Sequence, residues 1–197
     1  MVRIRGFEPA DTAAMYEICL RTGNSGQDAT GLFRDPNLIG EVYVGAYLAL
    51  EPDLAFVGVD GGVAGYVIGA RDTERFEARC EREWWPALRE RYPLRSFPDG
   101  TSDARLVGLI HKPPIRRADV AERYPAHLHI DLLPKVQGGG NGRRLMATLL
   151  DALADAGVPG VHLGVAMANE RAIGFYRHLG FTEVVRYTDS LVMARKL

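Results

Sequence analysis

Residues 127–165 read HLHIDLLPKVQGGGNGRRLMATLLDALADAGVPGVHLGV, and this stretch predicts a strand, a glycine-rich turn, a helix and a second strand. The helix is expected over 142–156, because its leucines and Met146 recur at three- and four-residue spacing along one stripe. The strands are expected at 127–133, where Pro134 ends the first, and at 161–165. Such a strand–helix–strand unit is right-handed and its two strands are parallel. The stretch therefore predicts an α/β fold.

The turn between the first strand and the helix is Gln137-Gly138-Gly139-Gly140-Asn141-Gly142-Arg143-Arg144. Its glycines leave backbone N–H groups uncovered at a helix N-terminus, where these groups and the helix dipole attract an anion. Two arginines in the first helical turn add positive charge suited to phosphate. A nucleoside-triphosphate loop needs a lysine here and a dinucleotide loop needs a third glycine at position 143, so the turn fits neither. A glycine-rich turn that binds nothing stays open as an alternative.

A second motif follows at residues 169–181, which read NERAIGFYRHLGF. Asn169 is typical of a helix N-cap and Gly180 of a helix end, so a short helix is expected between them. Asn169, Ile173 and Tyr176 share one face of this helix. That face can present a polar cap residue and a phenol toward the glycine-rich turn. A tyrosine that only packs in the core is the alternative for Tyr176.

The rest of the chain predicts further strands and helices around this unit. The apolar runs on either side of Asp60-Gly61 are a strong hairpin signal. A charged helix is expected over 72–91, and the Pro-, Asp- and Arg-rich stretch 96–124 is expected to be irregular. The other expected elements are strands at 2–5, 54–59, 63–70, 181–186 and 190–194, helices at 8–21 and 38–47, and a loop at 22–31.

Composition excludes several classes of function. A chain of 197 residues with 47% hydrophobic and 25% charged residues is typical of one globular domain. A net charge of −1 is not that of a general nucleic-acid binder, and no apolar run is long enough for a membrane span. Cys19 and Cys80 are far apart without metal-ligand spacing, so no metal site is expected. With no apolar secretory segment at the N-terminus, a cytoplasmic location is expected.

Both motifs resemble those of one superfamily. Gln137-x-x-Gly140-x-Gly142 matches the Q/R-x-x-G-x-G/A signature of the GCN5-related N-acetyltransferases (GNAT), and residues 169–181 look like their second acetyl-CoA segment. The stretch 22–94 is similar to the acetyltransferase-like domain of O-GlcNAcase and its free-standing bacterial relatives. The resemblance implies a single domain over 1–197 with a mixed, mostly antiparallel sheet, splayed parallel strands four and five, and helices on both faces. The main departure is an inserted helical or irregular segment at about 72–126, where a tight hairpin normally joins strands three and four.

The resemblance also implies acetyl-CoA as the cofactor. The pantetheine arm would enter the gap between strands four and five, and the pyrophosphate would rest on the amides of the glycine-rich turn. The residues expected to bind the cofactor are Ile130, Leu132, Leu133, Gln137, Gly138, Gly139, Gly140, Asn141, Gly142, Arg143, Arg144, Asn169 and Tyr176.

Three residues are the catalytic candidates. The resemblance makes Tyr176 the acid that protonates the departing thiolate. An alkyl ammonium acceptor has a pKa near ~10.4, so some group must take up its proton. His127, His129 and Asp131 alternate on one face of strand four; Asp131 is the first choice for this base and His129 the second, either directly or through water. The alternatives are that Asp131 bonds neighbouring backbone or an arginine, and that the histidines are satisfied within a half-buried face.

The resemblance places residues 22–47 over the acceptor pocket, and the polar substrate candidates there are Asp28, Asp35, Tyr43 and Tyr47. A solvated loop is the alternative for each of them. The resemblance therefore implies transfer of an acetyl group directly from acetyl-CoA to a primary amine of a small molecule or peptide. The alternative is a non-catalytic module that binds CoA or a peptide. Homodimers are frequent among relatives, so a homodimer is a candidate assembly.

Overall fold

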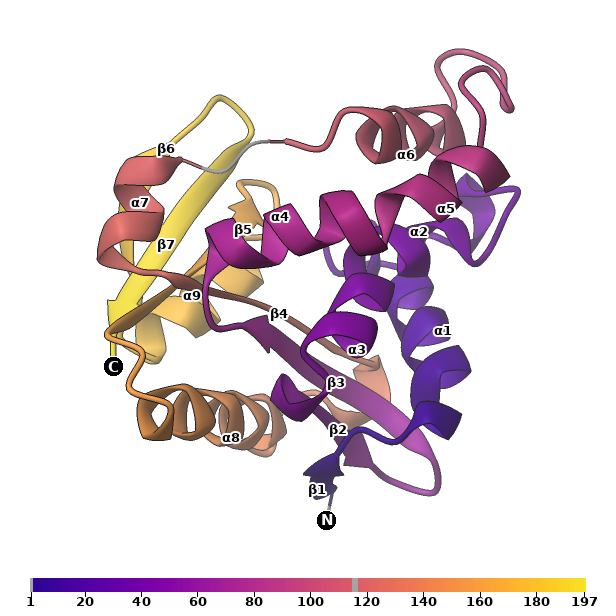
Figure 1. Ribbon diagram of the computed structural model, residues 1–197. Helices are drawn as coiled ribbons and strands as arrows, with labels where there is room; N and C mark the ends of the chain where they lie inside the picture. Colours follow the sequence, from indigo (N-terminus) through magenta and orange to yellow (C-terminus); the bar gives the residue numbers. More distant parts are fainter. Residues whose placement is uncertain (1, 115–116) are drawn as a thin grey trace.

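The computed structural model describes residues 2–114 and 117–197, and its described strands form one seven-stranded sheet (Figure 1). The strand order is β1-β2-β3-β4-β5-β7-β6, and every neighbouring pair is antiparallel except β4 and β5. This confirms the predicted mixed, mostly antiparallel sheet. The strands are β1 (Arg3–Gly6), β2 (Ala55–Val59), β3 (Val63–Ala70), β4 (Ala126–Leu132), β5 (Gly160–Ala166), β6 (Thr182–Arg186) and β7 (Ser190–Lys196).

The expected hairpin joins β2 to β3. Asp60 N donates to Gly62 O over 2.8 Å, and both Gly61 and Gly62 have positive φ angles, 65° and 155°. Only glycine adopts the second of these conformations at little cost. The two glycines after Asp60 therefore permit the tight turn that lets β2 and β3 pair.

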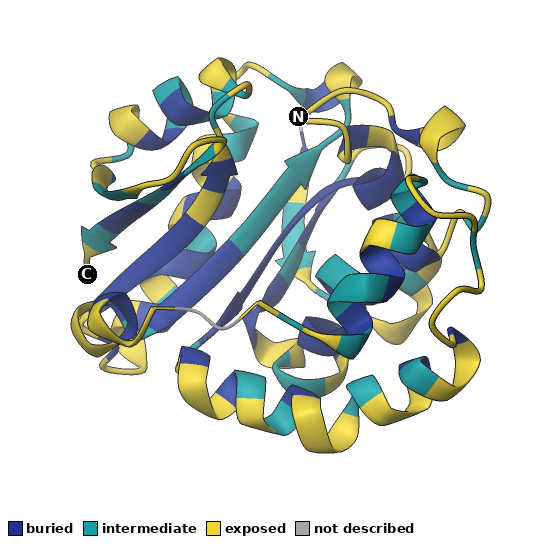
Figure 2. Ribbon diagram, turned by 90° about the horizontal axis from the view of Figure 1, so that it is seen from above, coloured by how far each residue is buried: buried dark blue, intermediate teal, exposed yellow. Residues whose placement is uncertain are grey.

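Helices cover both faces of the sheet, and each face has its own apolar core. Tyr66 and Ile68 of β3 belong to the core under α1, whereas Val67 belongs to the core under α8, because successive strand side chains point to opposite faces. Figure 2 shows the central strands buried or half-buried between helices whose outer faces are exposed. The helices are α1 (Thr12–Thr22), α2 (Leu38–Gly40), α3 (Ala46–Leu50), α4 (Thr73–Glu83), α5 (Trp85–Arg91), α6 (Ser102–His111), α7 (Ala118–Arg123), α8 (Asn141–Asp155) and α9 (Glu170–His178). None of those in the described part of the chain has the length and apolarity that a bilayer crossing requires.

Short helical turns complete the path of the chain. A π-helical segment at Glu41–Gly45 joins α2 to α3, so the expected helix at 38–47 is one continuous rod of mixed type. Single 3-10 turns lie at Pro9–Asp11, Thr30–Leu32, Pro52–Leu54 and Pro134–Val136.

The connection from β3 to β4 is helical, and the prediction that 96–124 is irregular was wrong. Residues 102–111 form α6 and residues 118–123 form α7, while 115–116 of that stretch lie outside the described residues. Thr101 caps α6 by accepting a 3.2 Å hydrogen bond from Ala104 N, and α6 buries an apolar stripe. The Pro and Gly residues on either side of this helix favoured an irregular structure in the sequence analysis and outweighed the short stripe. The expected helix 72–91 is two helices, because Trp84 breaks the rod and Pro86 starts α5.

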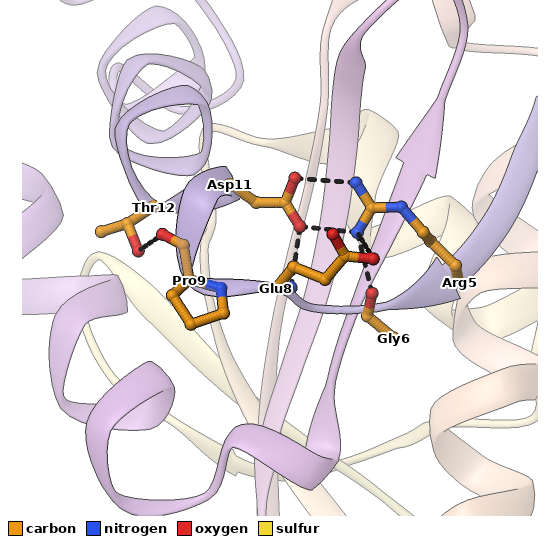
Figure 3. Close-up of polar contacts among 6 residues, drawn as sticks. All are labelled: Arg5, Gly6, Glu8, Pro9, Asp11 and Thr12. Atoms are coloured by element: carbon orange, nitrogen blue, oxygen red, sulfur yellow. Dashed lines mark hydrogen bonds and ion pairs between the residues drawn. The ribbon is translucent and has the colours of Figure 1, made fainter.

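A bidentate ion pair holds the start of the first helix to the first strand (Figure 3). Arg5 donates from both terminal nitrogens to Asp11, at 2.6 and 2.8 Å, and Asp11 also accepts from Glu8 N at 2.8 Å. The Arg5 hydrogen bonds lower the pKa of the Asp11 carboxyl. This buried carboxylate therefore holds the N-terminal end of α1 next to the edge strand β1.

Candidate active site

The parallel strands β4 and β5 separate soon after they meet. They pair only at Ala126 with Val161 and at His127 with His162, whereas β4 stays paired to β3 as far as Leu132. Beyond His127, one edge of β4 therefore faces a gap inside the sheet instead of a neighbouring strand. The predicted divergence of the two strands is present, and the glycine-rich turn follows the end of β4 at the mouth of this gap.

The glycine-rich turn exposes its backbone amides. Gly138, Gly139 and Gly140 all have positive φ angles of 80°, 56° and 78°, and a Cβ on Gly138 or Gly140 would meet no atom within 4 Å. Among the described residues, no acceptor is recorded for the amides of these three glycines, Gly142 or Arg143. Five N–H groups without a recorded acceptor in the described part of the chain thus lie at the N-terminus of α8, where such groups can bind phosphate.

Side chains around the turn hold its shape. Gln137 Nε2 donates to Leu132 O over 2.8 Å and its Oε1 accepts from Arg171 over 2.6 Å, while Asn141 Nδ2 donates to Val136 O over 3.0 Å. Arg144 donates to Val2 O over 3.0 Å, which directs it toward β1. These side chains brace the turn, and the amides remain uncovered.

Arg143 and the end of α9 border a separate groove beside α8. Arg143 is exposed, and it lines this groove of about 400 Å³ together with Asp151, His178 and Arg195. The groove contains none of the catalytic candidates. Both arginines are exposed, but Arg144 donates to Val2 O, whereas Arg143 borders this groove.

The first turn of α9 closes the other side of the mouth. Asn169 Oδ1 accepts from Ala172 N over 3.1 Å, which confirms the predicted cap. A Cβ on Gly26 would lie 3.4 Å from Asn169 Nδ2, so the loop after α1 reaches this cap. A Cβ on Gly142 would lie 3.3 Å from the Phe175 ring. The glycine at 142 therefore lets α8 and α9 approach closely.

Asp131 lies at the centre of a polar cluster on the α1 face of β4. Its Oδ2 accepts from Tyr66 Oη over 2.6 Å and lies 2.8 Å from His129 Nε2. The His129 ring stacks between Tyr43 and Tyr66, with ring centroids 6.2 and 6.0 Å away. The sequence left open that Asp131 bonds neighbouring backbone or an arginine. Its recorded partners are instead the Tyr66 phenol and the His129 imidazole.

Further groups reach the cluster from helices. Cys19 of α1 brings its thiol near Asp131, and burial, then this carboxylate, raises the pKa of that thiol. Tyr43 lies in the π-helical segment, where the wider turn is typical of functional positions. Burial raises the pKa of the Tyr43 phenol, against the opposing effect of the nearby Arg105 guanidinium of α6.

Tyr176 approaches from the opposite face of the sheet. It is 8% exposed and packs against Phe175 and Phe181. Burial, and then the charge on Asp131, raises the pKa of its phenol, so that the hydroxyl keeps its proton at neutral pH.

The other sequence candidates lie outside this cluster. Asp28 is exposed and caps its own loop through Thr30, and Asp35 accepts from Tyr92 Oη over 2.7 Å and from Asn37 N. Tyr47 is buried against Phe76 and His127. Of the four substrate candidates, only Tyr43 has a recorded contact with this cluster, through the His129 ring.

Sequence reasoning missed Tyr66, Cys19 and Arg105. Tyr66 lies directly opposite Asp131 in the β3–β4 register, which pairing of the hairpin strand with β4 would have indicated. Cys19 carried no signal beyond helical periodicity, because its contact with β4 depends on how α1 packs. Arg105 lies in the stretch that was expected to be irregular.

Comparison with known proteins agrees with the fold and the motifs. The chain is similar to SsHAT, with 41% identity, a TM-score of 0.93 and coverage of 99% of this chain and 98% of that one. It is 29% identical to protein O-GlcNAcase of Rattus norvegicus over 98% of this chain, but it spans only 22% of that protein. The fold is also that of the PaiA N-acetyltransferase of Thermoplasma acidophilum, solved with coenzyme A, at 14% identity, full coverage of this chain, 99% coverage of that one and a TM-score of 0.61.

A family model matches the middle of the chain, from the end of the π-helical segment to the residue before β6, and includes β2 to β5. It matches residues 45–181, which include the glycine-rich turn, Asp131 and Tyr176, and its description is acetyltransferase (GNAT) family. With the splayed strands and the open amides, this match identifies the chain as a member of the acetyltransferase (GNAT) family.

Proposed function

We propose that the protein is an acetyl-CoA-dependent N-acetyltransferase that acts on a primary amine of a small molecule or peptide. The single observation that carries the proposal is the gap between β4 and β5, which has open amides at its mouth and Tyr66, His129 and Asp131 beside it. We further propose that residues 1–197 act as one domain in which α4–α7 form the insertion.

The residues present fit the cofactor. The amides of Gly138–Arg143 would hold the pyrophosphate, and the unpaired edge of β4 from Ile130 to Leu133 would bond the amide groups of the pantetheine arm. Each charge-assisted hydrogen bond contributes about 1.5–3 kcal/mol, so several together suffice for a specific site. Asn169 would contribute mainly by positioning the start of α9 beside the gap, since its side-chain oxygen Oδ1 caps that helix. When bound, acetyl-CoA supplies an acetyl group activated as a thioester.

Asp131 and His129 would take up the acceptor's proton. Removing a proton from an alkyl ammonium near pH 7.4 costs roughly 4 kcal/mol, so the amine needs a nearby base. Tyr66 fixes Asp131 and the carboxylate fixes the imidazole. As the N–C bond forms and the C–S bond breaks, the proton lost by the nitrogen passes to this pair.

Tyr176 would stabilise the leaving sulfur. Its phenol has a raised pKa, above the ~8.5 of a thiol, so complete proton transfer to sulfur is uphill by about 1.4 kcal/mol per unit of difference. The phenol therefore acts first as a hydrogen-bond donor to the departing thiolate. Its burial makes that hydrogen bond stronger than it would be in water.

The test is turnover of acetyl-CoA with a panel of amines, followed by release of free thiol. We expect thiol release with at least one amine, and a fall of about 10²-fold or more in kcat for Tyr176→Phe and for Asp131→Asn. Tyr187→Phe is the matched control, because Tyr187 is an exposed tyrosine at the β6–β7 turn. Acetyl-CoA binding without turnover of any amine would instead support the non-catalytic module.

A further inference from the structure

Three side chains of metal-binding type meet beside the gap. They are Cys19 of α1 and His129 and Asp131 of β4, and one donor atom from each lies within 4.8 Å of the other two. Cys19 is 2% exposed, and the other two are half-buried. The sequence separates Cys19 from His129 by more than a hundred positions, so only the fold makes this group.

We propose that this group is a binding site for Zn²⁺. A thiolate, an imidazole and a carboxylate are the donors that zinc takes in tetrahedral sites, whereas Mg²⁺ and Ca²⁺ select sets of oxygen atoms. Three protein ligands leave a fourth position for water or another ligand. On binding, the Cys19 thiol releases its proton to solvent and the sulfur becomes the ligand.

The geometry requires a modest contraction. Zinc bonds of about 2.0–2.3 Å place tetrahedral ligand atoms about 3.3–3.7 Å apart, so the widest pair must close by up to about 1 Å. His129 Nε2 and Asp131 Oδ2 lie only 2.8 Å apart, closer than two ligands of one zinc ion, so this hydrogen bond must open by about 0.5 Å as the metal binds. Side-chain rotation at His129 and at Cys19, whose thiol now donates to Ile39 O over 3.8 Å, would supply this movement without a change in the strand.

The surroundings hold the carboxylate in place for a metal. The fully buried Tyr66 donates to Asp131 Oδ2, and the hydrogen bonds recorded for this carboxylate among the described residues all use that atom. Oδ1 therefore remains available as a ligand atom. A hydrogen bond of this kind to a ligating carboxylate orients it and strengthens metal binding.

A kinetic consequence follows, and it rests on the proposed function. Asp131 and His129 cannot take up the acceptor's proton while both ligate zinc. Zn²⁺ should therefore inhibit acetyl transfer, and added amine should relieve the inhibition if it competes for the fourth position. Metal binding itself does not depend on acetyl-CoA, so the two proposals can fail separately.

The experiment titrates chelator-treated, reduced full-length protein with Co²⁺, which reports a sulfur ligand through a thiolate charge-transfer band, and then displaces it with Zn²⁺. We expect one equivalent, with the band lost in Cys19→Ser and zinc affinity weakened on the order of 100-fold. Cys80→Ser is the matched control, because Cys80 is also buried and free but lies on α4. It should keep both the band and the affinity.

Far-UV circular dichroism would show whether Cys19→Ser folds. If it does not fold, a second variant still tests the site. Asp131→Asn replaces the carboxylate ligand by a neutral amide and keeps the thiol, so it should keep the charge-transfer band and bind zinc more weakly. Absence of a stoichiometric band in the wild type, or its loss in Cys80→Ser with retention in Cys19→Ser, would overturn the proposal, whatever the transferase assay shows.

Discussion

The Tyr66 hydroxyl sets the direction in which the Asp131 carboxylate faces. Tyr66 is fully buried, it lies opposite Asp131 in the strand register, and its ring also stacks on His129. Burial, and then the Asp131 charge, raises the pKa of the Tyr66 phenol, so it remains a hydrogen-bond donor. A single hydroxyl thus orders both groups that we propose as the base.

Replacing Tyr66 with phenylalanine should therefore lower kcat by about 10- to 100-fold, because Asp131 would no longer be held in line with the acceptor's proton. The KM for acetyl-CoA should stay unchanged, since the amides of the turn are untouched. Steady-state kinetics with the best amine measure both. Tyr16→Phe is the control: it removes a similar 3.1 Å bond from a half-buried phenol to Glu41, away from the cluster. Equal losses in both variants would mean that Tyr66 acts only through stability.

Asp11 gives a prediction on stability and pH. Its pKa is lowered in the folded protein by hydrogen bonds from Arg5, so it stabilises the fold above the unfolded value near ~3.9 and loses this effect as pH falls through the folded value. Asp11→Asn should lower the free energy of unfolding by about 1–3 kcal/mol at pH 7. Urea unfolding from pH 7 to pH 3 should show the difference from wild type shrinking below about pH 4. A difference that does not change with pH would exclude the ion pair as its source.

At the scale of elements, the glycine-rich turn depends on left-handed backbone. Gly140 has a φ of 78° and no neighbour that a Cβ would meet, so alanine there is strained by conformation and not by contact. Gly140→Ala should cost about 1–2 kcal/mol of stability, or else shift the turn and weaken acetyl-CoA binding. Gly174→Ala is the control, because Gly174 lies within α9 with open space around it, and it should be neutral or stabilising. Thermal unfolding and calorimetry with acetyl-CoA separate the two effects, and unchanged values for Gly140→Ala would contradict this account.

Elements with one strong local signal were predictable. The apolar stripe of α8, the Asp60-Gly61 turn and the Asn169 cap each depend on neighbours in the sequence. The helix α6 was not predictable, because the Pro and Gly residues that flank it outweighed a short apolar stripe. At the site, the alternation of His129 and Asp131 along one strand was visible, whereas Tyr66 and Cys19 required the register of β3 and the packing of α1. Long-range packing leaves little trace in local spacing.

At the scale of the whole molecule, the segment from α4 to α7 is tied to the rest of the fold. Asp103 of α6 is 1% exposed and accepts from the amides of Arg34 and Asp35, each at 3.1 Å. Trp84 Nε1 donates to Glu41 O over 3.1 Å. These bonds join the segment to the loop and helix that precede β2.

The protein should therefore unfold in one transition. Trp84 and Trp85 are the two tryptophans of the chain and both lie in this segment, so their fluorescence reports it, while far-UV circular dichroism reports the whole sheet. The two thermal curves should coincide. Asp103→Ala should lower both midpoints together, because it removes the charged acceptor of the Arg34 and Asp35 amides, at a cost of about 1–3 kcal/mol. Asp99→Ala, at an exposed position, should have little effect. Separate midpoints would mean that the segment is an independent unit.

The strand β4 is interior to the sheet and yet keeps one edge unpaired beyond His127. Amides along an antiparallel strand alternate between its two sides. The rate of amide deuterium exchange from Leu128 to Leu132 should consequently alternate from one residue to the next. It should be slow where the amide hydrogen bonds to β3 and fast where the amide points into the gap. A ligand that lies along that edge should slow the fast set alone, which would report occupancy residue by residue without any chemistry taking place.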